Sequence, residues 1–146
     1  IMNEPQSVTI FLVEDDEVEI EAVTRAFRNA HIGNPVQTAK DGIEALDMLR
    51  GHNGQLKLDK PYLILLDLNM PRMNGLEFLQ ELRSDAELCD TVVFVLTTSN
   101  EDRDKVAAYA EHIAGYIVKS QAGRDFLELI ELLQHYWKIV EFPPKL

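Results

Sequence analysis

The chain lacks several features that would assign it to a class of protein at once. Cys89 is the only cysteine among 146 residues, so no internal disulfide is possible, and the four histidines lack the close spacing of a zinc motif. No apolar stretch reaches the length of a membrane span. The N-terminus does not show the basic-then-apolar layout of a signal peptide. We therefore expect a cytoplasmic protein that has no membrane partner.

Positive charge is also scarce. The formal net charge is -11 at pH 7, from 14 Lys and Arg against 25 Asp and Glu. Such a chain repels phosphate backbones and anionic lipids, so we expect no direct nucleic-acid binding; a divalent cation or a basic protein surface is the better partner. Apolar residues make up 46% and charged residues 27%, without repeats or low-complexity tracts, which is typical of one globular domain.

Short apolar runs alternate five times with helical patterns. Runs typical of buried strands cover residues 8–13, 35–38, 62–66, 91–96 and 115–118. Helical spacing follows each run, over residues 17–30, 42–50, a segment capped by Asn74, a segment capped by Asn100 that ends at Ala110, and residues 122–137. This alternation predicts an α/β fold, a doubly wound parallel sheet with five helices on its two faces. The core spans residues 8–137, followed by a tail at 138–146.

Polar residues follow four of these strands at the point where each ends. They are Glu14-Asp15-Asp16, Asp67-Leu68-Asn69, Thr97-Thr98-Ser99 and Lys119-Ser120. Because parallel strands bring their carboxyl ends to one edge of the sheet, these side chains should converge. Clustered carboxylates repel one another unless a cation intervenes, and magnesium accepts one or two carboxylates and shares its site with phosphate oxygens. The pattern predicts a magnesium and phosphate site, where Lys119 supplies positive charge and Thr97 a hydrogen bond.

Each of these residues also has an ordinary structural explanation. Asp15 or Asp16 can cap a helix, Asp67 can begin a turn before Pro71, and Lys119 can be a solvated strand end. Each explanation is adequate by itself. The joint occurrence of all four elements at corresponding strand ends favours a functional site.

The ordered motifs resemble the signatures of two-component receiver domains. The matching segments are Phe11-Leu12-Val13-Glu14-Asp15-Asp16, Leu65-Leu66-Asp67-Leu68-Asn69-Met70-Pro71-Arg72-Met73-Asn74-Gly75, Val95-Leu96-Thr97-Thr98-Ser99 and Gly115-Tyr116-Ile117-Val118-Lys119. The resemblance covers residues 8 to 137 and implies a flavodoxin-like sheet in the strand order 2-1-3-4-5.

The resemblance also implies roles at the site. Asp67 would accept a phosphoryl group from the phosphohistidine of a histidine kinase. Asp15, Asp67 and the backbone carbonyl of Asn69 would bind Mg2+, with Glu14 in the outer part of the acidic pair. Lys119 would pair with the phosphoryl oxygens. Transfer of this kind depends mostly on positioning and charge neutralisation.

Thr97 and Tyr116 match the switch pair of the family. On phosphorylation the hydroxyl would turn toward the phosphoryl group and the ring would move inward, changing the face built by the fourth helix, fifth strand and fifth helix. Asn69 and Ser99 lie where the family tunes dephosphorylation. One departure is Ser120, since the family usually has proline after this lysine in a cis peptide. A cis bond before a non-proline residue costs about 3 kcal/mol or more, so the loop is either strained or trans.

The C-terminal segment and the polar loop before the third strand resemble the single-domain regulators that partner with phytochrome histidine kinases. This resemblance implies a stand-alone response regulator that signals by protein contact, catalysing only its own phosphorylation and dephosphorylation. In that group the extended C-terminus contributes to a homodimer, here through Trp137, Val140 and Phe142. The alternative is that these residues fold back onto their own subunit.

Two other functions are compatible with part of this pattern. A haloacid-dehalogenase phosphatase also uses an aspartate after a buried strand, but it requires a second aspartate where Asn69 stands. A receiver-like interaction module that works without phosphorylation is the second alternative. The complete acceptor set argues against it.

Overall fold

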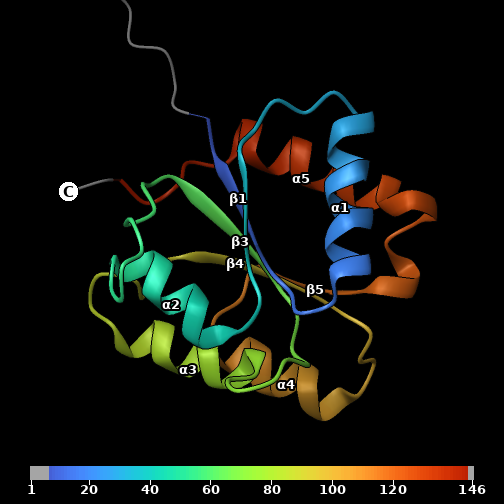
Figure 1. Ribbon diagram of the computed structural model, residues 1–146. Helices are drawn as coiled ribbons and strands as arrows, with labels where there is room; N and C mark the ends of the chain where they lie inside the picture. Colours follow the sequence, from blue (N-terminus) through green and yellow to red (C-terminus); the bar gives the residue numbers. More distant parts are fainter. Residues whose placement is uncertain (1–6, 145–146) are drawn as a thin grey trace, which may run out of the picture.

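The computed structural model describes residues 7–144 and shows one parallel sheet covered by helices on both faces (Figure 1). The strand order is β2-β1-β3-β4-β5, as predicted. The strands are β1 (Thr9–Val13), β2 (Val36–Ala39), β3 (Tyr62–Leu66), β4 (Val92–Thr97) and β5 (Gly115–Val118). All paired strands are parallel, so their carboxyl ends share one edge.

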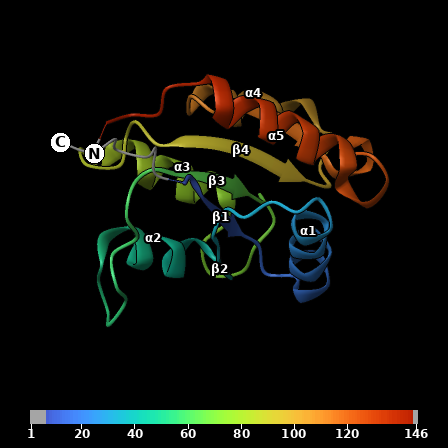
Figure 2. The same ribbon diagram turned by 90° about the horizontal axis from the view of Figure 1, so that it is seen from above.

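The helices divide between the two faces of the sheet, as Figure 1 shows; Figure 2 looks down on one of the covered faces. Helices α1 (Glu17–Asn29) and α5 (Leu127–Ile139) pack on one face, and α2 (Gly42–Arg50), α3 (Gly75–Ser84) and α4 (Asp102–Ala110) pack on the other. Every residue of β3 is buried, with Leu63 and Leu65 on the first face and Ile64 and Leu66 on the second. Two apolar layers therefore hold the central strand, which explains its unbroken apolar sequence.

The helix N-termini confirm some of the predicted caps. The Asp16 carboxylate accepts a hydrogen bond from the Val18 N–H (2.9 Å) at the start of α1. Asn74 and Glu77 form a reciprocal capping box at the start of α3. The predicted cap at Asn100 is wrong: Glu101 occupies the cap position of α4 and makes no side-chain cap hydrogen bond. Its N–H instead donates to the Ser99 hydroxyl (3.3 Å), so the serine takes over part of the capping role.

The fifth helix begins later than predicted. Residues Lys119–Gln121 and Arg124–Phe126 form separate 3-10 turns, and α5 begins only at Leu127. Gly123, Asp125 and Phe126 have φ values of 85°, 53° and 60°, which an α-helix cannot accommodate. The helix predicted from residue 122 therefore includes the Arg124–Phe126 turn as well as the true helix.

The tail partly folds back onto its own chain. The Phe142 and Tyr136 rings make an edge contact at 6.0 Å, and Phe142 and Trp137 pack against the core on the α1 and α5 face. Ile139 and Val140, in contrast, are 78% and 37% exposed. Residues 145–146 of the predicted tail lie outside the described part of the chain. Over residues 7–144, no helix is long and apolar enough to cross a membrane.

Candidate functional site

A buried strand and a tight turn position Asp67 at the carboxyl edge of the sheet. Asp67 follows β3 directly and is only 6% exposed. The chain turns back so sharply that the Gly75 N–H donates to the Leu68 carbonyl (3.0 Å). A Cβ at residue 75 would lie 2.5 Å from the Asp67 carbonyl oxygen and 2.7 Å from the Leu68 Cα. Glycine is needed at this position because no side chain fits between the helix start and the loop.

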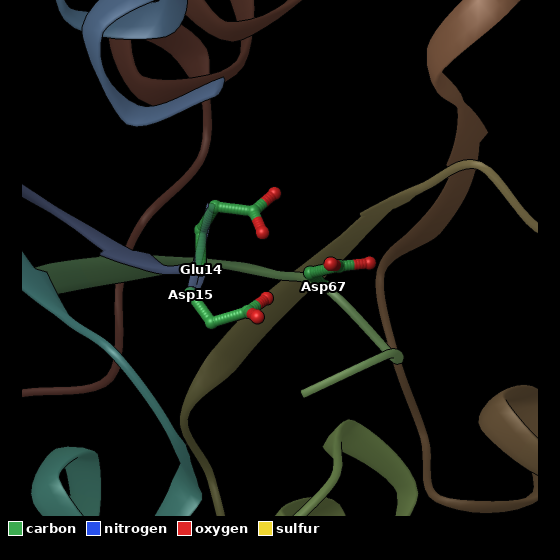
Figure 3. Close-up of side chains that lie close together, drawn as sticks. All are labelled: Glu14, Asp15 and Asp67. Atoms are coloured by element: carbon green, nitrogen blue, oxygen red, sulfur yellow. The ribbon is translucent and has the colours of Figure 1, made fainter. Parts of the chain in front are cut away.

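Three carboxylates meet beside this turn, as the strand ends predicted (Figure 3). One oxygen each from Glu14, Asp15 and Asp67 lies within 4.8 Å of the other two. Glu14 is buried and Asp15 is exposed. The Asp67 Oδ1 atom is buried and has no hydrogen-bond partner among the described residues. An unpartnered carboxylate oxygen inside an acidic cluster fits a divalent cation, which the three carboxylates could hold together. Asn69 follows at an exposed position of the same loop.

Lys119 reaches into this cluster from the end of β5. Its Nζ lies 2.6 Å from Glu14 Oε1, 3.9 Å from Asp67 Oδ2 and 4.0 Å from Glu19 Oε2. The only cis peptide bond in residues 7–144 is Lys60–Pro61, so the Lys119–Ser120 bond is trans. The departure at Ser120 therefore leaves the ammonium group within reach of Asp67.

The buried charges shift one another's pKa values. Burial raises the pKa of Glu14 to about 7; the hydrogen bond from Lys119 opposes this shift and repulsion from Asp67 adds to it. Burial lowers the pKa of Lys119, but the hydrogen bond to Glu14 and the charges of Asp67 and Glu19 outweigh it, so the net shift is upward. The lysine therefore stays positively charged at neutral pH, as a group that binds an anion must.

Ser99 links the two residues that match the switch pair. Thr97 is fully buried at the end of β4, and its hydroxyl accepts a long hydrogen bond from the Ser99 N–H (3.4 Å). The Tyr116 hydroxyl donates to the Ser99 carbonyl (3.0 Å), and the Ser99 hydroxyl donates to Asp104 Oδ2 (2.5 Å). The Tyr116 N–H donates to the Tyr109 hydroxyl (3.2 Å). Residues at the site thus connect to α4 through one short loop.

Three contacts around the site were not predicted from the sequence. Glu19 approaches Lys119, Asp104 holds Ser99, and Arg72 pairs with the buried Asp41 at 3.2 Å. Glu19 and Asp104 lie in the first turns of their helices, where acidic residues are expected for the helix dipole alone. Their contacts with Lys119 and Ser99 depend on which loop packs beside each helix, and the spacing of residues in the sequence does not specify that packing.

The fold and this site define a receiver domain. Residues 10–131 match the family model of the response regulator receiver domain, and the chain belongs to this family. Receiver domains act as phosphoacceptors, bind a divalent metal ion and partner with histidine kinases. Membership also sets aside the phosphatase alternative.

Individual response regulators are similar to this protein over most of its chain. The probable methanogenesis regulatory protein FilR2 of Methanothrix harundinacea is 34% identical over 128 residues, 88% of this chain and 82% of that protein. Response regulator Rcp1 of Synechocystis is 31% identical over 128 residues, 88% of this chain and 87% of Rcp1. The crystal structure of its Mn(2+)-bound form has a TM-score of 0.82, with 30% identity over 94% of this chain and 99% of that one. The structure of the phosphorylated cyanobacterial phytochrome response regulator RcpA has a TM-score of 0.85, with 34% identity over 95% and 100% of the two chains.

Proposed function

We propose that this protein accepts a phosphoryl group on Asp67 from the phosphohistidine of a sensor histidine kinase. A carboxylate oxygen of Asp67 attacks phosphorus, the phosphorus–nitrogen bond breaks, and the imidazole leaves as the aspartyl phosphate forms. The observation that carries this proposal is the buried Asp67 carboxylate, whose Oδ1 has no hydrogen-bond partner among the described residues and whose Oδ2 lies 3.9 Å from the Lys119 ammonium. An oxygen without a hydrogen-bond donor keeps its lone pairs available for attack.

The surrounding residues would bind the metal ion and the phosphoryl oxygens. Asp15, Asp67 and the Asn69 carbonyl would hold Mg2+, with Glu14 as the outer member of the acidic pair; a bound magnesium ion supplies positive charge to the phosphoryl oxygens. Lys119 supplies a second positive charge, and the Thr97 hydroxyl donates a hydrogen bond. The 4.8 Å cluster of carboxylates and the Mn(2+)-bound form of the similar Rcp1 support this assignment.

The output of this reaction is a change of protein contacts on the face of α4, β5 and α5. Thr97 and Tyr116 would act as the switch, and their shared contacts to Ser99 support a coupled movement. The similarity to the phytochrome regulator RcpA supports a phytochrome-type kinase as the partner in a light-signalling pathway. The alternative, an interaction module independent of phosphorylation, predicts no phosphoryl uptake at all.

Intact-mass measurement tests the phosphoryl transfer. Incubated with Mg2+ and an acyl phosphate such as acetyl phosphate, the protein should gain the mass of one phosphoryl group. Excess chelator should abolish the gain, because the uncompensated carboxylates would repel the anionic donor. The same protein with chelator and then restored Mg2+ serves as the control. If neither this donor nor a phosphorylated phytochrome kinase adds mass, the interaction-module alternative holds.

We also propose that the tail contributes to a homodimer. Trp137 and Phe142 pack on their own core, so the exposed Ile139 and Val140 are the tail residues available for a partner. An Ile139→Asp, Val140→Asp double variant should sediment as a monomer under conditions where the wild type is a dimer, because two charges would be buried at the contact. Val18→Asp, at a side chain that is 77% exposed in the first turn of α1, is the control. A double variant that remains dimeric overturns the proposal.

A further inference from the structure

Lys119 lies among more negative charge than the proposed metal site requires. Glu14 and Asp67 belong to the carboxylate cluster that could hold a cation. Glu19 does not belong to that cluster, yet its Oε2 lies 4.0 Å from Lys119 Nζ, almost the same distance as Asp67 Oδ2 at 3.9 Å. The ammonium group is thus shared between a carboxylate that would bear the phosphoryl group and one that would not.

The local structure turns Glu19 toward the lysine. Asp16 caps α1, and Glu17 and Glu19 follow in its first turn. The Glu17 side chain is 80% exposed and pairs with Lys40 at 3.6 Å, whereas the Glu19 side chain is only 31% exposed and faces Lys119. Both glutamates are equally placed for the helix dipole, so the dipole does not explain the difference in exposure.

We propose that Glu19 is a positioning residue that restrains the Lys119 ammonium and so sets how readily Asp67 accommodates an anionic phosphoryl group. This inference rests on the proposed function of Asp67. Glu19 acts in two ways, and both weaken the binding of an anionic group at Asp67. It attracts the ammonium toward α1, and its own charge repels the phosphoryl oxygens that Lys119 would bind. A cation held by Glu14, Asp15 and Asp67 would not coordinate Glu19, which lies outside this cluster, so the charge of Glu19 would not be neutralised by direct binding to the cation.

The Glu19→Gln substitution tests the inference because it removes the charge and keeps the shape. In saturating Mg2+, beryllofluoride, a phosphoryl mimic, should bind about two- to fivefold more tightly than to wild type, the effect expected of one partly exposed ion pair. The half-saturating concentration of acetyl phosphate should fall by a similar factor. Mg2+ affinity measured alone should fall slightly, by about twofold or less, since one nearby negative charge is lost.

Opposite changes in anion and metal affinity distinguish this role from others. A structural defect would weaken both, and a metal-ligand role for Glu19 would reduce Mg2+ affinity by tenfold or more. Glu17→Gln, which removes the other first-turn carboxylate, should leave anion binding at the wild-type value. Unchanged or weaker beryllofluoride binding in Glu19→Gln overturns the inference even if wild type is phosphorylated. Failure of both proteins to take up a phosphoryl group instead refutes the proposed function on which the inference depends.

Discussion

The Asp67→Asn protein is expected to take up no phosphoryl group and to be more stable than wild type when metal is chelated. The amide cannot form the acyl phosphate, and the neighbouring Asp15 and Glu14 cannot replace it. Asp15 is exposed, and Glu14 is held by the Lys119 ammonium at 2.6 Å. The loss of uptake should therefore be complete within the sensitivity of intact-mass detection.

The gain in stability has an electrostatic cause. Without a cation, Glu14, Asp15 and Asp67 place three carboxylates within 4.8 Å, against the single ammonium of Lys119. Removing one charge relieves repulsion that already contributes to the raised pKa of Glu14. We expect about 1 kcal/mol of added stability in chelator. The difference should shrink as Mg2+ is added, because the wild type then gains stability by binding the ion.

Thermal and urea unfolding with and without Mg2+ measure this effect. Asp16→Asn is the matched control, since asparagine replaces an exposed carboxylate close in sequence to the cluster and remains a good helix cap. Its phosphoryl uptake and its stability should stay close to the wild-type values. A mass gain that persists in Asp67→Asn would place the acceptor elsewhere. A less stable Asp67→Asn protein in chelator would mean that the cluster is not strained.

The central strand and its neighbours show why so much of the fold could be predicted. A parallel sheet with two covered faces requires an unbroken apolar run at β3, and the polar residue that ends the run must lie at the carboxyl edge. Residues 62–67 meet both conditions within one segment, and the strand is bounded as predicted. The cap predicted at Asn74 is equally local, since both hydrogen bonds of the capping box that it forms with Glu77 join residues three apart. The apolar strand and this cap could thus be predicted, whereas the equally local cap predicted at Asn100 is wrong, because Glu101 takes that position.

Contacts between distant segments, and local turns that interrupt a helical spacing, could not be predicted in this way. The start of α5 depends on the left-handed conformations of Asp125 and Phe126, which apolar spacing does not reveal. The contact between Glu19 and Lys119 joins residues 100 positions apart. The resemblance implies that Lys119 pairs with phosphoryl oxygens, but it implies no role for Glu19. The trans peptide at Ser120 likewise required the structure, because the sequence allowed either form.

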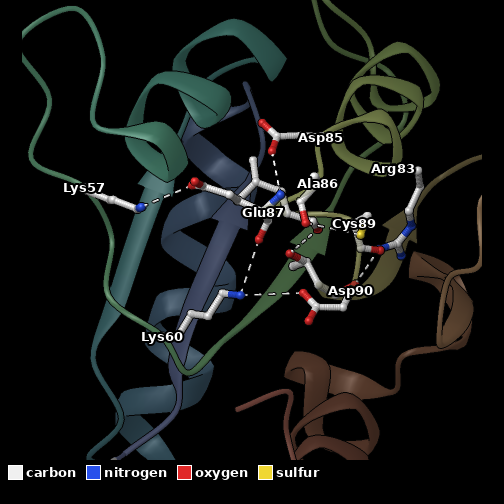
Figure 4. Close-up of polar contacts among 10 residues, drawn as sticks. Lys57, Lys60, Arg83, Asp85, Ala86, Glu87, Cys89 and Asp90 are labelled. Atoms are coloured by element: carbon white, nitrogen blue, oxygen red, sulfur yellow. Dashed lines mark hydrogen bonds and ion pairs between the residues drawn. The ribbon is translucent and has the colours of Figure 1, made fainter. Parts of the chain in front are cut away.

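Arg83 gives the largest expected effect on stability, and it lies far from the metal site. Its guanidinium donates to four backbone carbonyls: Nε to Glu111 (2.7 Å), Nη1 to Cys89 and Thr91 (2.8 Å each), and Nη2 to His112 (3.0 Å). Figure 4 shows Arg83 beside the segment that leads into β4. One side chain thus joins the end of α3 to both the α3–β4 and the α4–β5 connections, at the edge of the sheet opposite Asp67.

Arg83→Met should lower the free energy of unfolding by about 2 to 3 kcal/mol. The apolar stem is kept, but four carbonyls lose a charged donor, and the half-buried ones regain water only in part. The melting temperature should fall by roughly 5 to 10 °C for a chain of this size. Arg83→Lys should recover only part of the loss, because an ammonium cannot match the planar arrangement of four acceptors.

The four hydrogen bonds from Arg83 to backbone carbonyls are called the carbonyl clamp here. Arg25→Met is the control that distinguishes loss of this clamp from the loss of any arginine side chain. The Arg25 side chain is 59% exposed and makes one ion pair, with Glu21 at 3.2 Å, so its removal should change stability by about 0.5 kcal/mol or less. Phosphoryl uptake by folded Arg83→Met should stay at the wild-type level, because the carbonyl clamp contacts none of the carboxylates at the site. Equal stability of the two methionine variants would show that the four hydrogen bonds are replaced by water without cost. An uptake defect in a fully folded Arg83→Met protein would instead show that the clamp helps to position the α4–β5 connection for the site.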